Sequence, residues 1–463
     1  MKKVLIITYH FPPDAAVGSI RPSKFAKYLP EFGWRPLILT VKDKYYEKKD
    51  ESKWDDLREK AAVIRTDKLP NLRDIYLRLK MKLTKIQGNK SKLLEDTLNY
   101  EAILPSKDNE KGVKATIKRM IFSLLVWLPD DKLGWVPVAV LKGLRLIKKE
   151  NIDMILTTSP PHSVHLIGLI LKMITGKKWA ADFRDPWMID FKKPQFVRTR
   201  LSDEIERRME KKVAEKADLI ISTNERSTNK FITHYPNINA DKFVTIWNGF
   251  DEDDFCGLRD TKKNPVITIA YMGTFYHGRT PRLLLKALSE LVSERKIGDK
   301  DFSVQFIGDT RYADGESVEK MIQDFDLSAS VRVRGWIPYG EALKEMAKSH
   351  VLLLLASNQP LQIPGKVFEY IGLGSNILGI VDDGATSDLL RNYKKAVIVR
   401  ENDVPSLKKA IIYFHENYSG KNGPESKGFI EGYERRFLTR KLAEILNITY
   451  ATKYATTLLS KNA

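Results

Sequence analysis

The chain has 463 residues, of which 43% are hydrophobic, and it carries a formal charge of +19 at pH 7. This length and composition allow two or three domains with their own cores and exclude a disordered chain. The single cysteine, Cys256, excludes a disulfide framework and fits the reducing cytoplasm. So large a positive charge favours anionic partners: acidic lipids, phosphorylated substrates or nucleic acid.

The chain opens with a short apolar run, residues 4–8, that leads into Tyr9-His10-Phe11-Pro12-Pro13. The run is too short for the apolar part of a signal peptide, so we expect a buried strand. No apolar run in the sequence approaches the roughly 18 to 20 residues that span a bilayer. We therefore expect a protein that is soluble or lies on a membrane surface.

In the first half of the chain, short β-branched runs alternate with segments of helical period, such as residues 23–31 and 202–216. This alternation is typical of βαβ units and predicts a parallel, doubly wound sheet in an α/β fold. The expected strands are residues 4–8, 36–41, 62–66, 152–157, 179–183, 219–223 and 243–248.

A basic insertion interrupts this series at about residues 67–130. Its first part is rich in lysine and arginine, and its last part, Met120–Leu128, is apolar and contains Trp127. Basic residues beside an apolar, Trp-bearing segment are typical of a helix that lies in a membrane interface. The alternative is a solvated helix face next to an ordinary core helix.

A polar, turn-rich stretch at about residues 248–265 separates this series from a second one. We therefore expect two Rossmann-like domains, residues 1–250 and 260–437, that face a cleft, with ligands at the C-terminal ends of the strands. Residues 438–463 are expected to form a final helix. One arrangement that we consider is that this helix packs back on the N-terminal domain. The expected strands of the second series are residues 266–271, 302–307, 331–334, 351–355, 376–380 and 396–399.

The most informative motif begins at Gly365. Lys366 and Glu369 follow on a short predicted helix, which ends at Gly374 before the apolar run 376–380. A helix start after a glycine turn offers unpaired N–H groups and a positive dipole end to phosphate, and Lys366 adds a full charge. Glu369, one turn further on, can accept hydrogen bonds from sugar hydroxyls. The motif therefore predicts a site for a nucleotide diphosphate.

Several short motifs occur in an order and spacing that resemble one family over essentially the whole chain. The chain is similar to the GT-B glycosyltransferases of family four, also called glycosyltransferase group 1, and to their bacterial surface-polysaccharide members. The resemblance implies a GT-B fold, a retaining hexosyl- or N-acetylhexosaminyl-transferase activity, and a nucleotide sugar as co-substrate with no cofactor and no metal. The motifs are residues 11–13 with Gly18 and Arg21, residues 158–163, 182–187 and 248–251, and residues 271–273 with Gly278 and Arg279.

The resemblance also implies roles for the donor-site residues. Arg279 and Lys366 correspond to the cations that bind the diphosphate, and two cations neutralise its charge as it leaves. Glu369 corresponds to the residue that holds the ribose hydroxyls, and Gly273 lets the backbone approach phosphate. The alternatives are surface charges for Arg279 and Lys366, an acid that only complements the helix dipole for Glu369, and an ordinary turn at Gly273.

One position departs from the family pattern, which has two glutamates with seven residues between them. Glu369 matches the second glutamate, but Leu361 occupies the position of the first and cannot hydrogen-bond a sugar. The adjacent Gln362 is the candidate substitute. This departure bears on the recognition of the donor sugar more than on the class of reaction.

The candidate residues of the first domain follow predicted strand ends. Arg184 and Asp185 follow residues 179–183, and Asp185 is a candidate to orient or deprotonate the acceptor hydroxyl. His162 follows an earlier strand and can hydrogen-bond a sugar, while Gly18 and Arg21 can close on the donor or touch the acceptor. The alternative for Arg184 and Asp185 is a charged pair that fixes a loop.

Two patterns look like metal sites, and we reject both. His162 and His165 have no carboxylate or cysteine ligand nearby in the sequence, so a capped, partly buried histidine is favoured. Asp251-Glu252-Asp253 matches a manganese-binding pattern of a different glycosyltransferase fold. It follows Asn248-Gly249, however, where a turn or a helix start is favoured.

The expected function is the transfer of a sugar from a nucleotide-diphosphate sugar to a lipid-linked glycan in surface polysaccharide synthesis. The expected location is the cytoplasm, at the anionic inner face of the cell membrane. The alternatives are a non-catalytic sugar-nucleotide sensor or scaffold, suggested by Leu361, and a sugar-nucleotide epimerase. Nucleic acid is not an expected partner, because the basic residues lack the interleaved aromatics of single-strand binders.

Overall fold

The chain divides into two compact units, which we describe one at a time. Most of the basic insertion expected at residues 67–130, including residues 120–127, lies outside the described part of the chain. The computed structural model describes residues 1–51, 57, 61–71, 75, 128–189, 199–275, 278–417 and 427–459. Unit 1 consists of Met1–Thr223, Ser227–Ile246 and Thr439–Ala463, and unit 2 consists of Asn224–Arg226 and Trp247–Leu438.

Unit 1 is built on a seven-stranded parallel sheet in the order β3-β2-β1-β4-β5-β6-β7. Strand β1, next to the central strand β4, places Ile6 opposite Ile38 on one side and Leu156 on the other. This order, with a switch from β1 to β4, is doubly wound, as predicted. The strands are β1 (Lys2–Ile7), β2 (Trp34–Val41), β3 (Ala62–Thr66), β4 (Met154–Ser159), β5 (Lys178–Phe183), β6 (Leu219–Ser222) and β7 (Phe243–Thr245).

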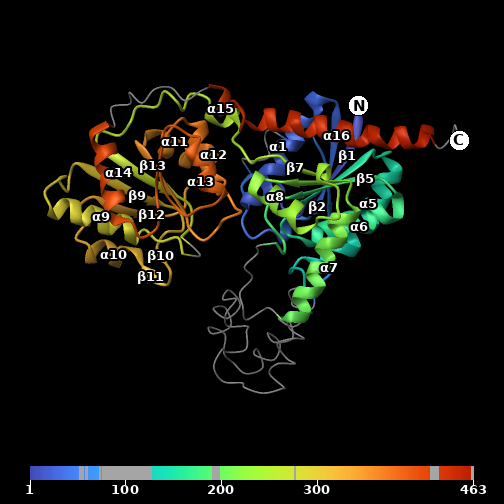
Figure 1. The fold of residues 1–463 in the computed structure, drawn as a ribbon, viewed down its shortest axis with the longest axis horizontal. Helices are drawn as coiled ribbons and strands as arrows, with labels where there is room; N and C mark the ends of the chain where they lie inside the picture. Colours follow the sequence, from blue (N-terminus) through green and yellow to red (C-terminus); the bar gives the residue numbers. More distant parts are fainter. Residues whose placement is uncertain are drawn as a thin grey trace, which may run out of the picture. The chain divides into compact units, whose positions relative to one another are not determined.

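The helices of unit 1 cover both faces of this sheet, with α1 and the C-terminal part of α16 on one face and α5 and α6 on the other (Figure 1). α16 is held by hydrogen bonds from Lys2 Nζ to Asn447 Oδ1 (2.7 Å) and from Tyr450 Oη to Asp153 Oδ1 (3.2 Å). The helices are α1 (Ile20–Tyr28), α5 (Val136–Lys149), α6 (Ser163–Thr175), α7 (Arg200–Lys216), α8 (Glu225–His234) and α16 (Arg435–Leu459).

Unit 2 is built on a six-stranded parallel sheet in the order β12-β9-β8-β13-β14-β15. β8 and β13 lie at its centre and consist almost wholly of buried apolar residues, as expected for a sheet covered on both faces. The strands are β8 (Ile267–Met272), β9 (Phe302–Ile307), β12 (Val331–Arg334), β13 (Val351–Ala356), β14 (Asn376–Val381) and β15 (Ala396–Val399).

Two apolar cores form in unit 2. One contains side chains of α9, α10 and α14, and the other contains side chains of α11, α12 and α13 together with Phe250 and Phe255. The helices are α9 (Arg282–Ser293), α10 (Val318–Asp324), α11 (Tyr339–Lys348), α12 (Lys366–Gly372), α13 (Ala385–Arg391), α14 (Val404–Asn417) and α15 (Lys427–Glu431). Among the helices of the described chain, none is long and apolar enough to cross a membrane.

The structure differs from the sequence prediction in two local details. β7 ends at Thr245, three residues early, and the carbonyl of the next residue, Ile246, accepts a hydrogen bond from Arg21 Nη2 (2.8 Å). A short antiparallel hairpin, β10 (Tyr312–Ala313) with β11 (Glu316–Ser317), was not predicted. Its turn contains Asp314 and Gly315, both with positive φ, which is a recognisable hairpin signal.

Candidate active site

Two glycines bring the ends of neighbouring strands together in unit 2. Gly273 follows β8 with a φ of 134°, and Gly308 follows β9 with a φ of 120°. A Cβ atom on Gly308 would lie 2.3 Å from the carbonyl oxygen of Gly273, and one on Gly273 would lie 2.8 Å from Lys366 Nζ. Both the conformation and the space therefore require glycine, which leaves the backbone open at the C-terminal edge of the sheet.

Lys366, the first residue of α12, extends its ammonium group to this edge. Its Nζ lies 3.8 Å from the centroid of the Tyr271 ring, which provides a cation–π contact. The Nζ atom is buried, and none of the residues described by the structure accepts a hydrogen bond from it. Burial, with a further contribution from the charge of Arg279, holds the pKa of Lys366 well below its usual value. A buried ammonium without an acceptor is costly, and an anionic ligand would satisfy it.

Arg279 supplies a second buried cation. It is 5% exposed, and its Nη2 donates a hydrogen bond of 2.9 Å to Gln359 Oε1. Gln359 lies in the loop between β13 and α12, two residues before Leu361. The charge of Arg279 contributes to the lowered pKa of Lys366, which places the two cations near each other. Two neighbouring cations of this kind suit a diphosphate.

Glu369 lies one turn after Lys366 on α12. Tyr339 Oη donates a hydrogen bond of 3.2 Å to its Oε1, and Tyr339 also lies 3.5 Å from Asp254 Oδ2. Burial raises the pKa of Glu369 to about 7, opposed by the hydrogen bond from Tyr339, while the charge of Asp254 raises it further. Glu369 is therefore a strong hydrogen-bond acceptor that is poorly solvated in the free protein, as expected for a group that binds hydroxyls.

The structure brings Gly273, Arg279, Lys366 and Glu369 together, as the sequence interpretation requires. Gly365 occupies the position before α12 and is exposed. Since α12 has only seven residues, its dipole is small, and the two cations provide most of the positive charge.

Sequence reasoning missed Tyr271, Tyr339 and Gln359. The first lies on a strand and the second at a helix start, and each contacts a site residue distant in the sequence. Only the position of Gln359, two residues before Leu361, offered a signal. Gln362, the candidate substitute, contributes its backbone carbonyl as an acceptor for Thr386.

The candidate residues of unit 1 form a separate cluster. Arg21 lies on α1, is 2% exposed, and makes a paired hydrogen bond to Asp182 through Nε (3.0 Å) and Nη2 (2.9 Å). Asp182 is 0% exposed and also accepts a hydrogen bond from Thr158 (2.7 Å). The guanidinium of Arg21 is thus buried and joins α1 to β5 through Asp182, although we expected it to contact a substrate.

Arg184 holds three segments together. Its Nε donates to the carbonyl of Ser159 (2.7 Å), and its Nη atoms donate to the carbonyls of Gly18 and Pro160. Burial lowers its pKa to about 10, opposed by the charges of Asp182 and Asp185. A Cβ atom at Gly18 would lie 3.0 Å from Arg184 Nη1. These contacts match the alternative interpretation, in which the charged pair Arg184–Asp185 fixes a loop.

His162 and His165 have different environments. His162 is 5% exposed and stacks on Trp187 with the ring planes 2° apart. His165 is fully buried between the hydroxyls of Thr157 and Ser159, each 2.8 Å away, and burial lowers its pKa to about 3. In the part of the chain that the structure describes, no group of three or more His, Cys, Asp and Glu side chains is arranged to hold a metal.

The pattern Asp251–Asp253 has the local role that the sequence favoured. The side chain of Asp251 accepts a hydrogen bond from the backbone N–H of Asp253 (3.2 Å) and caps a short 3₁₀ helix, Glu252–Phe255. The predicted helix start is therefore confirmed.

The loop after Arg184 is anchored by two buried carboxylates of α7. Trp187 Nε1 donates to Glu206 (2.9 Å), and Glu210 accepts from Tyr235 Oη and from the backbone N–H of Met188, both at 2.6 Å. Burial raises the pKa of Glu210 from 4.5 to about 7. The folded protein therefore binds this proton more tightly than the unfolded chain does.

This difference predicts a pH-dependent stability. Because the folded-state pKa of Glu210 is the higher one, its contribution to the free energy of unfolding falls as the pH rises from 4.5 to about 7. Glu210→Gln removes the titration; its amide oxygen can accept from the N–H of Met188, and its amide nitrogen can donate to Tyr235 Oη. We expect it to gain on the order of 2 to 3 kcal/mol relative to wild type between pH 5 and pH 8. Urea unfolding at both pH values measures this, and Glu204→Gln, whose side chain is 47% exposed on the same helix, is the control.

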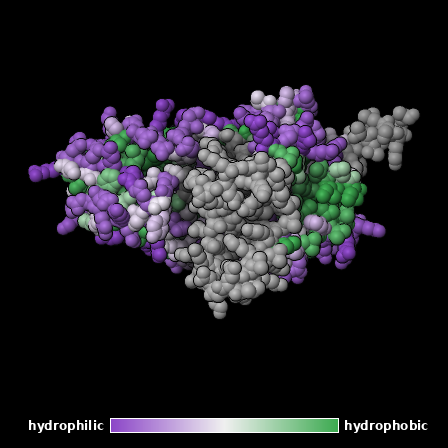
Figure 2. Space-filling model, turned by 90° about the horizontal axis from the view of Figure 1, so that it is seen from below, coloured by the Kyte–Doolittle hydropathy of each residue, from purple (hydrophilic) through white to green (hydrophobic). Residues whose placement is uncertain are grey.

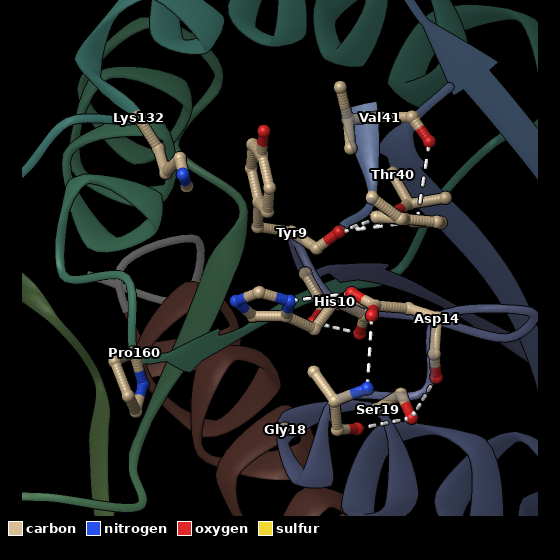
Figure 3. Close-up of polar contacts among 12 residues, drawn as sticks. Tyr9, His10, Asp14, Gly18, Ser19, Thr40, Val41, Lys132 and Pro160 are labelled. Atoms are coloured by element: carbon tan, nitrogen blue, oxygen red, sulfur yellow. Dashed lines mark hydrogen bonds and ion pairs between the residues drawn. The ribbon is translucent and has the colours of Figure 1, made fainter. Parts of the chain in front are cut away.

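A histidine–aspartate pair that we did not predict lies at the C-terminal end of β1. His10 Nδ1 is 2.7 Å from Asp14 Oδ2, and Asp14 Oδ1 accepts a hydrogen bond from the N–H of Ala16 (3.0 Å). Figure 3 shows the second ring nitrogen of His10 on the side away from Asp14, facing the space that Lys132 and Pro160 border. The signal in the sequence was the position of His10, directly after a predicted strand.

Comparison with known proteins gives a family match for most of unit 2 and solved structures that share the fold of the whole chain. Residues 259–430 match the family model described as Glycosyl transferases group 1. No curated protein matches the chain. Among solved structures, sucrose-phosphate synthase from Thermosynechococcus elongatus has a TM-score of 0.61 at 14% identity, over 98% of this chain and 100% of that one. Such a low identity establishes the fold alone.

Two further structures have the same fold. Anabaena Alr3699/HepE in complex with UDP-glucose has a TM-score of 0.53 at 13% identity, over 99% of this chain and 100% of that one. The lipopolysaccharide outer core galactosyltransferase WaaB in its apo form has a TM-score of 0.53 at 11% identity, over 96% and 99%.

Two parallel α/β units, with a cationic site at the strand ends of the second one, define the GT-B fold. The matched segment, which is most of unit 2, belongs to the glycosyl transferases group 1 family, as the resemblance implied. The protein is therefore a transferase enzyme.

Proposed function

We propose that the protein transfers a sugar, with retention of configuration, from a nucleotide-diphosphate sugar to a lipid-linked glycan in surface polysaccharide synthesis. The observation that carries this proposal is the buried ammonium of Lys366, which has no acceptor among the described residues and lies beside Arg279. A diphosphate satisfies both cations. As the bond from the sugar to the diphosphate breaks, negative charge builds on the leaving group, and the two cations stabilise it.

The remaining groups of the site fit the rest of a sugar nucleotide. Glu369 accepts hydrogen bonds from the ribose hydroxyls, and the glycine at position 273 gives the diphosphate access to the backbone. The complex of HepE with UDP-glucose supports a nucleotide sugar as ligand of this fold. Because two cations are present to neutralise the diphosphate, we propose a reaction that needs no metal.

The direct test is a panel of nucleotide sugars, read by thermal shift and by nucleotide release with and without membrane extract. We expect one class of donor to stabilise the protein, and its nucleotide to be released only when extract and enzyme are both present, also in EDTA. Stabilisation without release from any donor would instead favour the non-catalytic sensor or scaffold suggested by Leu361. Release of a free epimerised sugar nucleotide without an acceptor would favour an epimerase.

The proposed acceptor is lipid-linked, and the surface of unit 1 supports a site on the inner face of the membrane. WaaB, which shares the fold, is a lipopolysaccharide galactosyltransferase. Leu141 on α5 and Met173 and Ile174 on α6 are each at least 60% exposed. α5 also carries Lys142, Arg145, Lys148 and Lys149 and no acidic residue. Figure 2 shows the apolar patch in green, at the position that α5 and α6 have in Figure 1.

This patch, Leu141 with Met173 and Ile174, predicts binding to anionic vesicles. We expect sedimentation with phosphatidylglycerol vesicles, not with phosphatidylcholine vesicles, and a decrease as salt is added. Replacing the four basic residues of α5 with glutamine should weaken binding by about 100-fold or more, since each contributes about 1 kcal/mol. Replacing the three patch residues with glutamine should weaken it as well. Tyr312→Gln/Tyr413→Gln, at exposed positions of unit 2, is the control, and equal binding by all variants would contradict the proposal.

A further inference from the structure

We propose that His10 accepts the proton of the acceptor hydroxyl, and that the space bordered by His10, Tyr9, Lys132 and Pro160 receives a sugar of the acceptor. The inference rests on the proposed transferase function and adds the residue that activates the second substrate. In the step itself, the acceptor oxygen bonds to the anomeric carbon and its proton moves to His10 Nε2. The bond from that carbon to the diphosphate breaks, and the diphosphate leaves with the electron pair.

The first argument is the position of His10. It lies three residues after the end of β1, at the switch from β1 to β4 in the unit 1 sheet. Ligands of open α/β sheets bind outside the C-terminal ends of strands, at such a switch point. The neighbouring loop contributes Pro160, which follows β4 directly. Figure 3 shows Pro160, Lys132 and His10 around one space at this edge.

The second argument is the tautomer. The carboxylate of Asp14 accepts hydrogen bonds, so Nδ1 of His10 is the nitrogen that carries the proton, at 2.7 Å from Asp14 Oδ2. Asp14 is 4% exposed, and its other oxygen is fixed by the N–H of Ala16. Nε2 consequently has a free lone pair for a hydroxyl proton, and the carboxylate stabilises the imidazolium that forms.

The third argument is that the histidine is held in place yet remains accessible. The Tyr9 ring packs edge-on against it, with centroids 5.3 Å apart, and the carbonyl of His10 accepts a hydrogen bond from Thr8 (2.9 Å). Its side chain is nevertheless 27% exposed, in contrast to 5% for Asp14. A Cβ atom at Gly18 would lie 3.3 Å from His10 Cδ2 and 3.0 Å from Arg184 Nη1, so glycine leaves room for the side chains of both His10 and Arg184.

The structure favours His10 over Asp185 for this role. Asp185 lies beside the buried guanidinium of Arg184 and contributes its charge to stabilising that cation. Arg184 in turn fixes the carbonyls of Gly18 and Pro160, which border the proposed sugar site. The charge of Asp185 thus acts on the Arg184 cation, whereas Nε2 of His10 faces the space between Lys132 and Pro160.

The experiment uses the full chain with a donor from the panel and octyl glycosides as soluble acceptors. We expect His10→Ala to lower kcat by about 10²- to 10⁴-fold with little change in donor affinity. Added imidazole should restore part of the loss, which a purely structural role would not allow. Asp14→Asn should lower kcat less, and His234→Ala, at an exposed position of unit 1, should not change it. A His10→Ala rate near that of wild type, or a loss that imidazole does not rescue in a folded variant, would overturn the inference.

A second readout does not depend on transfer. Diethyl pyrocarbonate modifies accessible histidines, and mass spectrometry reports the modification of His10. We expect a matching octyl glycoside to protect His10 but not His234. Absence of protection by every glycoside would overturn the acceptor site, whatever the outcome of the donor panel. Protection without turnover with any donor would leave the acceptor site standing and refute the transferase function instead.

Discussion

Replacing Lys366 with methionine is expected to abolish transfer and at the same time to make the free protein more stable. The ammonium is buried without an acceptor among the described residues, which costs about 1 to 3 kcal/mol and is offset in part by the cation–π contact with Tyr271. Methionine has a similar shape and no such cost, so we expect the free energy of unfolding to rise by about 1 to 2 kcal/mol. The rate should fall by about 10²- to 10³-fold, because a charge that stabilises the leaving group is lost.

Urea unfolding and nucleotide release measure the two effects on the same preparations. Lys286→Met, at an exposed position of α9, is the matched control and should change neither quantity much. Thermal shift with the nucleoside diphosphate gives a third readout, since Lys366→Met should lose most of the stabilisation by ligand. If Lys366→Met were destabilised while it still bound the diphosphate, Lys366 would be a structural residue.

Replacing Asp182 is expected to destabilise unit 1 severely, whereas replacing Lys366 is expected to stabilise the protein. Asp182→Ala leaves the guanidinium of Arg21, which is 2% exposed, without its counter-charge. Removing one partner of a buried ion pair typically costs about 3 to 5 kcal/mol. We expect a loss of this size in the free energy of unfolding, measured by urea denaturation.

An exposed pair on α7 supplies the control for this prediction. Glu204 contacts Arg208 at 2.9 Å with both side chains largely exposed, so Glu204→Ala should cost about 1 kcal/mol or less. Replacing both buried partners, as Arg21→Met/Asp182→Leu, should recover much of the loss because no charge remains buried. Equal effects of Asp182→Ala and Glu204→Ala would refute the importance of the buried pair.

The sequence predicted the strands of both sheets well, since each is a short apolar run bounded by turn residues. Residues 302–307, 331–334 and 396–399 were predicted with the bounds that β9, β12 and β15 have. In these segments the apolar pattern and the flanking turn residues predict the same bounds. The prediction for Arg21 did not anticipate its environment, because a lone arginine after a strand has the same local pattern whether it contacts substrate or a buried carboxylate.

The sequence alone determined that this protein has two series of parallel strands and that Gly273, Arg279, Lys366 and Glu369 belong to the second. Those signals depend on spacing along the chain. The tertiary structure decided which charged groups meet: Arg21 with Asp182, 161 positions away, and Glu369 with Tyr339, 30 positions away. It also decided that the ammonium of Lys366 is buried without an acceptor among the described residues and that the second ring nitrogen of His10 faces away from Asp14. Burial and contacts between distant residues arise only when strands align in a sheet, so no local pattern contains them.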